Sequence, residues 1–494
     1  MMHPFFQKID RALARTSVGL LLAAGFVFFC AQFTGCAVMI PPSGGPRDSL
    51  PPVLVAALPK DSMLHFTGNK IVLTFDEYVQ LDNAQMNMIV SPNPKKQPNV
   101  TSKLKTVTVT LKDTLKPNTT YALNFGKSIK DVNEGNVFRN FTYAFSTGDH
   151  LDTDSVTGKV VLAQTGTVDT TLIVLLHRNL NDTAVKTVRP DYYTTLDSGG
   201  NFTFRFLPAG DYNIFALSND YAKQYRDSTM MFAFYGKVLH VTDSTAPEKI
   251  VLYAYRQAKE EEKKKENESD DDEHKKKKKQ NKIPKLKMST NLDNGKQDLL
   301  GSFCFSFDRP LEKLDTSKIV LADTLYKPIQ GYRILHDSTD TTHTRFVLEY
   351  PWKEDQYFKL IVDTLSALDS ANIGLAKTDT IDFSTKQEAA YAGLRIRFPD
   401  VDMDRNPVLQ FFKGGKEVDS IPLNSNKEVV RRLYPPGEYE LKILYDLNKN
   451  RRWDPGDYDK KIQPEIVERI RRKFDFKANW DNEPEIFLHD QPRQ

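Results

Sequence analysis

Hydrophobic and polar residues alternate with a period of two along most of the chain. Between residues 50 and 149, clear segments of this kind are 70–75, 106–111 and 120–125. Turn-forming residues such as Ser91-Pro92-Asn93-Pro94 separate them, and no helical period of any length interrupts the series. Because successive side chains of a strand point to opposite faces, each segment predicts a half-buried strand. Short strands at this spacing predict a β-sandwich.

The segment 50–149 also carries short motifs that resemble the SbsA-type bacterial Ig-like domain. In chain order they are Pro51-Pro52, Phe75-Asp76-Glu77, 115–121, 131–136 and Phe145-Ser146-Thr147-Gly148. The resemblance implies a sandwich of about seven strands and no catalytic residues. Asp131, Asn133 and Asn136 lie in the fourth motif, where Gly135 and the Asx residues favour a turn over a metal loop.

Residues 156–256 continue the strand pattern with different turns. The unbroken apolar run 171–176 predicts a central strand that is covered on both faces. Residues 201–206 place three phenylalanines on one face, and Leu207-Pro208-Ala209-Gly210-Asp211 turns the chain into 212–216. This hairpin resembles the carboxypeptidase-regulatory-like, transthyretin-like sandwich. The resemblance implies an accessory or binding module without chemistry of its own.

A strongly charged segment, 257–283, interrupts the strand pattern. It has no apolar residue between Ala258 and Ile283, so it has nothing to bury in a core. The lysine run 275–279 is, as an alternative, a nucleic-acid or lipid-phosphate patch, but acidic residues flank it and no aromatic residue interleaves with it. The segment is therefore predicted to be a solvated linker between domains.

The strand scheme repeats after this linker. Residues 381–385 echo 143–147, which predicts a second, degenerate Ig-like domain over 284–386. The turn with glycine and asparagine at 131–136 has a counterpart at 367–372 that has lost the Gly-Asn pair.

A second repeat follows at the C-terminal end. The stretch 432–439 parallels 205–212 and predicts a second transthyretin-like module over 391–488. The order Ig-like, transthyretin-like, linker, Ig-like, transthyretin-like is typical of duplication of a two-domain unit. The predicted fold class is all-β, a tandem array of β-sandwich domains after an N-terminal signal helix.

The first 35 residues have the layout of a secretory signal, with basic residues, the apolar run 18–31 and small residues in turn. The exit Phe33-Thr34-Gly35-Cys36 resembles the lipobox of bacterial lipoproteins. The resemblance implies that Cys36 becomes the lipidated N-terminus, carrying palmitate-like acyl chains, with 36–49 as a flexible spacer. Two or more such chains anchor a protein stably, since each buried methylene contributes about 0.8 kcal/mol. The alternative is an ordinary signal peptide with a chance cysteine.

These features predict a protein of the cell envelope that is tethered to a membrane through its lipid anchor. Ala37-Val38-Met39 follow the cysteine instead of acidic residues, which favours the periplasmic face of an outer membrane. The formal net charge is only +3 over 494 residues, so no global field attracts nucleic acid, and no nucleic-acid partner is expected. Of three cysteines, only Cys304 lies beyond the signal and the anchor, so no disulfide can form within the domains.

One loop carries a candidate metal site. In residues 446–457, oxygen side chains occupy positions 1, 3, 5, 9 and 12, the spacing of an EF-hand-type calcium loop. The candidate calcium ligands are Asp446, Asn448, Asn450, Asp454 and Asp457. Arg451 stands where the sharp turn prefers glycine, and an aspartate replaces the bidentate glutamate. The alternative is an Asx-rich turn whose side chains bond their own backbone.

Asp-Ser and Asp-Thr pairs followed by an aliphatic residue or threonine recur along the chain, for example at Ser49 and Thr183. The pattern resembles an O-glycosylation acceptor of some Gram-negative bacteria, which implies bulky glycans on the surface. The alternative is that such pairs simply form turns at strand ends in a β-rich chain. The sequence leaves both interpretations open.

No catalytic residues are predicted. The sequence lacks a Gly-x-Ser-x-Gly elbow, a His-Glu-x-x-His pair and a phosphate-binding glycine loop, and its nine histidines are scattered without ligand spacing. We therefore expect a non-enzymatic envelope protein that serves as a structural or binding scaffold for an unknown protein or glycan partner. The alternatives are an accessory glycan- or protein-binding subunit of an outer-membrane complex and, third, a hydrolase whose site is assembled from distant loops.

Overall fold

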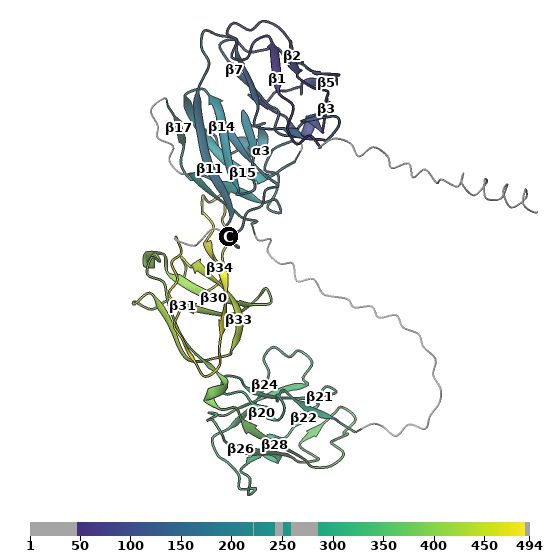
Figure 1. Cartoon of the computed structure of the whole chain (residues 1–494). Helices are drawn as coiled ribbons and strands as arrows, with labels where there is room; N and C mark the ends of the chain where they lie inside the picture. Colours follow the sequence, from purple (N-terminus) through teal and green to yellow (C-terminus); the bar gives the residue numbers. More distant parts are fainter. Residues whose placement is uncertain (1–46, 221, 243–249, 258–284, 490–494) are drawn as a thin grey trace, which may run out of the picture.

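The computed structural model of the chain describes residues 47–220, 222–242, 250–257 and 285–489 (Figure 1). The predicted signal peptide, Cys36 and nearly all of the predicted linker lie outside these residues. The described part is built almost wholly from β-strands around four large hydrophobic clusters that follow one another along the chain. The expectation of an all-β, tandem β-sandwich fold is thereby confirmed. We refer to the four units as the first to fourth sandwich.

The first sandwich packs the sheet β1-β2-β6-β5 against the sheet β10-β7-β4, with β3-β8-β9 at one end. Its strands show the alternation expected from the sequence, since Ile71, Leu73 and Phe75 of β2 are buried and their neighbours are not. The elements are β1 (Leu54–Leu58), β2 (Lys70–Phe75), β3 (Val79–Leu81), α2 (Ala84–Asn87), β4 (Ile89–Ser91), β5 (Asn99–Lys103), β6 (Thr106–Thr110), β7 (Thr120–Asn124), β8 (Ile129–Asp131), β9 (Val137–Phe138) and β10 (Thr142–Ser146).

The second sandwich packs the sheet β14-β11-β18 against β13-β12-β15-β16, and β17 pairs with β15. Every residue of β12 is buried, as expected of its unbroken apolar run, because a second hydrophobic cluster covers the outer face of its sheet. The elements are β11 (Asp154–Leu162), β12 (Leu172–His177), α3 (Ala184–Thr187), β13 (Tyr192–Thr195), β14 (Asn201–Leu207), β15 (Gly210–Ser218), β16 (Phe232–Phe234), β17 (Leu239–Val241) and β18 (Ile250–Ala254).

The third sandwich consists of the sheets β19-β21-β25-β24 and β20-β28-β26-β23, with the small ladder β22-β27. Three phenylalanines of β21 point into its core, while Cys304 between them is a partly exposed free thiol. The elements are β19 (Met288–Thr290), β20 (Lys296–Gln297), β21 (Phe303–Phe307), β22 (Lys313–Leu314), η1 (Thr316–Lys318), β23 (Ile319–Ala322), β24 (Arg333–His336), β25 (Arg345–Glu349), β26 (Tyr357–Val362), β27 (Ala367–Leu368), β28 (Asp379–Thr385) and η2 (Glu388–Ala390).

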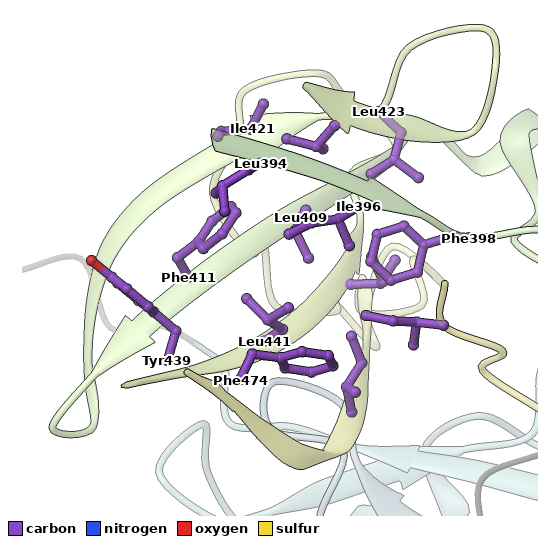
Figure 2. Close-up of a cluster of buried hydrophobic side chains, with 14 of the residues drawn as sticks. Leu394, Ile396, Phe398, Leu409, Phe411, Ile421, Leu423, Tyr439, Leu441 and Phe474 are labelled. Atoms are coloured by element: carbon purple, nitrogen blue, oxygen red, sulfur yellow. The ribbon is translucent and has the colours of Figure 1, made fainter. Parts of the chain in front are cut away.

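The fourth sandwich packs β32-β29-β35 against β31-β30-β33-β34. Figure 2 shows its core, where Leu409 and Phe411 of one strand and Leu441 of the next lie between the two layers. The elements are β29 (Ala392–Arg397), η3 (Met403–Arg405), β30 (Pro407–Lys413), β31 (Lys416–Pro422), β32 (Glu428–Tyr434), β33 (Gly437–Tyr445), β34 (Ile466–Phe476) and β35 (Asp481–Asn482).

The second and fourth sandwiches share their construction in detail. In both, the turn between two long strands uses a glycine with positive φ, Gly210 at 148° and Gly437 at 132°. In both, a buried tyrosine two residues later donates its hydroxyl to a proline carbonyl of that turn, Tyr212 at 2.8 Å and Tyr439 at 2.9 Å. Each unit also pairs its first strand in parallel with its last. The two units therefore have the internal likeness that duplication predicts.

The order of the sandwiches in space differs from their order in the sequence. The fourth sandwich lies between the second and the third (Figure 1). At one end it contacts the third, where the Tyr391 hydroxyl accepts the Leu299 N–H at 2.7 Å and donates to Asp298 at 2.8 Å. At the other end it contacts the second sandwich, as described below. No helix within the described ranges is long and apolar enough to cross a bilayer.

Candidate metal loop and the joint between the second and fourth sandwiches

The candidate metal loop is the first part of the connection from β33 to β34, residues 446–465. Asp446 directly follows β33 and is almost fully buried, with 1% of its surface exposed. Its carboxylate accepts the backbone N–H of Asn450 at 3.1 Å and of Arg451 at 2.7 Å. Arg451 has a φ of 62°, so the chain makes the sharp left-handed turn at this position without a glycine.

Three of the other predicted ligands lie together in this turn. The side-chain amides of Asn448 and Asn450 both donate to the same carboxylate oxygen of Asp454, each at 2.6 Å. The side-chain Oδ1 of Asn448 in turn accepts the backbone N–H of Asn450 at 3.1 Å. Four of the five predicted side chains therefore belong to one hydrogen-bonded turn.

The fifth predicted ligand, Asp457, lies apart from this turn. Its carboxylate accepts the backbone N–H of Lys460 at 3.2 Å and forms a 3.0 Å ion pair with the Lys460 ammonium group. Hydrogen bonds from Lys460 hold the pKa of Asp457 below its usual range. This aspartate closes a separate small turn with Ile462 instead of facing Asp446.

Glu465, which the sequence analysis did not single out, is the carboxylate that faces the turn. It is 5% exposed and accepts the backbone N–H of Leu447 at 2.8 Å and of Asp454 at 3.1 Å. Burial raises its pKa, and the neighbouring carboxylates of Asp446 and Asp454 add to the rise. Glu465 lies eight residues beyond the EF-hand-type window, just before β34, so ligand spacing alone gave no signal for it.

The oxygen atoms of this turn suit a hard cation only in part. Asp446, Asp454 and Glu465 supply carboxylates, and Asn448 and Asn450 supply amides that would present oxygen to a cation after rotation about their last bond. In the arrangement described, both amides instead bond Asp454. Across the described ranges, no three His, Cys, Asp or Glu side chains stand close enough together to hold a metal ion. Calcium binding at this loop stays a prediction.

The second part of the connection docks onto the second sandwich. Tyr458 is 3% exposed, and its ring packs against Phe215, Phe232 and Phe234, with centroid distances between 5.1 and 5.8 Å. Its hydroxyl donates to the carbonyl oxygen of Asp182 at 2.8 Å. Since the hydroxyl is bonded and the ring is enclosed, this single side chain anchors one sandwich in the other.

Polar contacts surround this aromatic anchor. Lys186 and Asp459 form an ion pair at 2.5 Å, and Asp182 and Lys461 form another at 2.7 Å. The Gln463 side chain donates to the carbonyl oxygen of Phe234 at 3.0 Å. A buried aromatic centre with a charged rim is the usual anatomy of a specific protein interface. We call the set of contacts made by residues 456–467 the joint.

Two backbone features bring the joint together. The N–H of Val467 donates to the carbonyl of Ala163 at 2.8 Å, so β34 meets the second sandwich directly. Gly456 lies against the Tyr255 ring, and a Cβ atom placed on it would come within 2.7 Å of that ring and 2.8 Å of the Ile462 carbonyl. Glycine is therefore required here by close approach.

The remaining predicted sites are placed as follows. Cys36 lies outside the described residues. Ser49 and Thr183 are both exposed, and the hydroxyl of Thr183 donates to Asn181 at 2.9 Å. The aspartate before Ser49 accepts the N–H of Leu50 at 2.9 Å, the Asx-turn contact that the alternative interpretation expects. O-glycosylation at these positions stays a prediction.

Comparison with known proteins bears on the first sandwich. Residues 48–147 match the bacterial Ig-like domain family. The expected Ig-like domain at this place is thus confirmed. No curated protein matches the chain.

Solved structures with a detectable likeness include pilin subunits and an S-layer protein of bacteria. The Bacillus anthracis TIE protein is 12% identical over 90% of this chain and 75% of its own, with a TM-score of 0.15. BcpA, the major pilin subunit of Bacillus cereus, is 9% identical over 67% of this chain and 99% of its own, with a TM-score of 0.17. The N-terminal part of the bacterial S-layer protein SbsC is 17% identical over 42% and 44%, with a TM-score of 0.15. Superpositions this poor carry no argument about fold or function.

Proposed function

We propose that the chain is a non-enzymatic scaffold of the bacterial cell envelope, held on a membrane by lipid at Cys36. The first sandwich then stands nearest the bilayer, and the third stands at the far end of the row. The observation that carries the proposal is the row itself, four sandwiches in contact through bonded interfaces. The absence of catalytic motifs from the sequence agrees with a structural role.

The interfaces give the proposed scaffold its stiffness. Between the first and second sandwiches, Asn93 donates its N–H to Asp191 at 2.7 Å and its side-chain amide to Pro190 at 3.1 Å. The joint connects the second sandwich with the fourth, and Tyr391 connects the fourth with the third. A linker alone would leave such domains free to move independently. Direct contacts at every step favour a rod that spaces two parties at a fixed distance.

Membrane attachment is tested by comparing two cysteine variants. Wild-type protein is expected to fractionate with outer-membrane vesicles and to incorporate labelled palmitate. Cys36→Ala is expected to lose both, because one acyl chain or none binds a bilayer only weakly. Cys304→Ala, which removes the other cysteine of the mature chain, is the matched control and should behave like wild type. Vesicle-bound, palmitate-free wild-type protein would contradict the proposal.

A second candidate property is calcium binding at the metal loop. The specific observation is that Arg451 makes the turn that EF-hand-type loops need at their sixth position, while Glu465 supplies the second deep carboxylate in place of Asp457. The carboxylates of Asp446, Asp454 and Glu465 do not stand close enough together to hold an ion as they lie. Binding would therefore require them to move closer together and the Asn448 and Asn450 amides to turn away from Asp454. Its effect would be to stiffen the loop that leads into the joint, and no chemistry is assigned to it.

A further inference from the structure

A polar cleft separates the first sandwich from the second. Its volume is about 990 Å³, within the range of natural ligand sites. One wall is the outward face of the sheet β10-β7-β4, and the other is formed by β13 and β14, which are the outer strands of their sheets. The sandwiches meet where β4 contacts β13 and where β7 contacts β14. Binding sites between domains commonly have this layout.

Short polar side chains line both walls. From the first sandwich come Ser91, Asn124 and Thr142, one from each strand of the sheet, and from the second come Thr194 and Thr203. More than half of the lining residues carry a hydroxyl or a carboxamide group. Such groups both donate and accept hydrogen bonds, so they match a ligand that is itself covered with hydroxyls.

The cleft is also cationic. Lys127, Arg139 and Arg205 are exposed on its lining, and their side chains have no hydrogen-bond or ion-pair partner among the described residues. Among the described residues of the lining, Asp197 is the single carboxylate, and it already accepts the N–H groups of Gly199 and Asn201, each at 2.8 Å. Three uncompensated positive charges in a concave polar site favour an anionic ligand.

An aromatic residue in an unusual backbone conformation completes the site. Phe206 has a φ of 58°, a conformation that a bulky side chain rarely adopts. Its half-buried ring lines this cleft and an adjoining cavity of about 510 Å³. Residues held in this way are enriched at ligand-binding sites.

The fourth sandwich offers an internal comparison. Arg205-Phe206 of the second sandwich corresponds to Arg432-Leu433 of the fourth. Arg432 forms a 2.6 Å ion pair with Glu388, and Leu433 does not share the positive φ of Phe206. The unpaired arginine and the left-handed aromatic residue thus distinguish the copy that borders the cleft from the copy that does not.

We propose that the cleft between the first and second sandwiches binds an anionic oligosaccharide. Its hydroxyls pair with the threonine and asparagine side chains of the walls. Its carboxylate or sulfate groups pair with Lys127, Arg139 and Arg205, where guanidinium groups bind both oxygens of such an anion. The ring of Phe206 lies against a sugar face. An acidic peptide satisfies the charges but leaves the hydroxyl-lined walls with few partners.

The test measures fluorescence anisotropy of labelled hexasaccharides with the full chain at physiological ionic strength. One probe is a hexagalacturonate and another is a sulfated heparin hexasaccharide, with neutral maltohexaose and a hexaglutamate peptide for comparison. We expect at least one of the two anionic sugars to bind and both comparison probes to bind at least about tenfold more weakly. The double variant Arg139→Gln/Arg205→Gln should lose about tenfold in affinity, as expected for two exposed charge contacts.

Arg432→Gln is the matched control, since it makes the same exchange at the corresponding place in the fourth sandwich, and it should retain wild-type affinity. Thermal unfolding of all variants verifies that both arginine exchanges leave the fold intact. The proposal is overturned if neither anionic sugar binds, if the double variant binds as tightly as wild type, or if hexaglutamate binds equally well. These outcomes do not depend on membrane attachment, because binding is measured with protein in solution. The fractionation of Cys36→Ala tests the lipid anchor separately.

Discussion

The second and fourth sandwiches share their turns but differ in the long connections between their strands. Their turns match, with Gly210 and Tyr212 in one and Gly437 and Tyr439 in the other. In the fourth, the connection 446–465 reaches the second sandwich through Tyr458. In the described part of the corresponding connection of the second, Tyr225 stacks on Phe232 of its own sandwich. The second supplies the aromatic pocket that receives the connection 446–465. The two units therefore share a framework but carry different surfaces, and these surfaces bind each other.

The largest expected effect comes from the anchor of the joint. Tyr458→Ala removes a buried ring and its hydroxyl bond to Asp182, so the joint is expected to weaken by about 3 kcal/mol. Urea unfolding is monitored by hydrogen exchange. In the variant, the second and fourth sandwiches should unfold at different urea concentrations. Tyr357→Ala, which removes an exposed tyrosine of the third sandwich, serves as the control. If Tyr458→Ala unfolds in the same way as wild type, the ring of Tyr458 is not the anchor of the joint.

A smaller effect is expected from Gly456→Ala. The added methyl group collides with the Tyr255 ring and the Ile462 carbonyl, and overpacking of this kind costs about 1 to 3 kcal/mol. Gly236→Ala is the matched control at the same joint, because its methyl group meets only the Gln463 side chain at 3.5 Å. Chemical denaturation of both variants gives the comparison, and equal stability would refute the role assigned to Gly456.

Calcium provides the next test of the fourth sandwich. Saturating calcium should stabilise the wild-type protein by about 2 kcal/mol if the loop binds it, and a chelator should reverse the gain. Glu465→Gln is expected to abolish most of this gain, while Asp457→Asn should keep it, because Asp457 bonds Lys460 outside the turn. If calcium does not change the melting temperature of the wild-type protein, the loop is an Asx-rich turn and not a calcium site.

The smallest expected effect concerns pH and the second sandwich. His177 on β12 is fully buried, and neither ring nitrogen has a partner among the described residues. Burial lowers its pKa, and the Asp191 carboxylate opposes this only in part. As the pH falls through about 6.5, His177 binds a proton in the unfolded chain but stays neutral in the folded protein. The free energy of unfolding therefore decreases on acidification.

The variant His177→Leu should therefore lose less stability than wild type between pH 7 and pH 5. Ile173→Leu, which exchanges a buried residue of the same strand that cannot titrate, is the control and should keep the wild-type pH dependence. Parallel curves for wild type and His177→Leu would show that this histidine does not set the acid sensitivity of the second sandwich.

Periodicity in the sequence predicted the strands well, because most strands bury one face in the core of their own sandwich. The apolar run before His177 predicted a doubly covered strand, and β12 is buried throughout. The motifs around Phe75 and Phe145 indicated the Ig-like domain that the family match at residues 48–147 confirms.

The contacts between sandwiches left no comparable signal in the sequence. Tyr458 and Phe232 are 226 positions apart, so no local pattern links the ring to its pocket. Glu465 lies beyond the window in which ligand spacing is counted. The cleft with Arg205 exists only because two domains meet, and a period-two strand pattern carries no information about its neighbour.

The most direct test of the central claim is to cut the chain between the second and third sandwiches. A protease site inserted near residue 270 allows cleavage of the intact protein, followed by gel filtration at low concentration. The account predicts that both halves elute together as one species, because the joint holds the second sandwich to the fourth. They should separate in the cleaved Tyr458→Ala variant. Separation of the wild-type halves would contradict the row of sandwiches and the scaffold proposed from it.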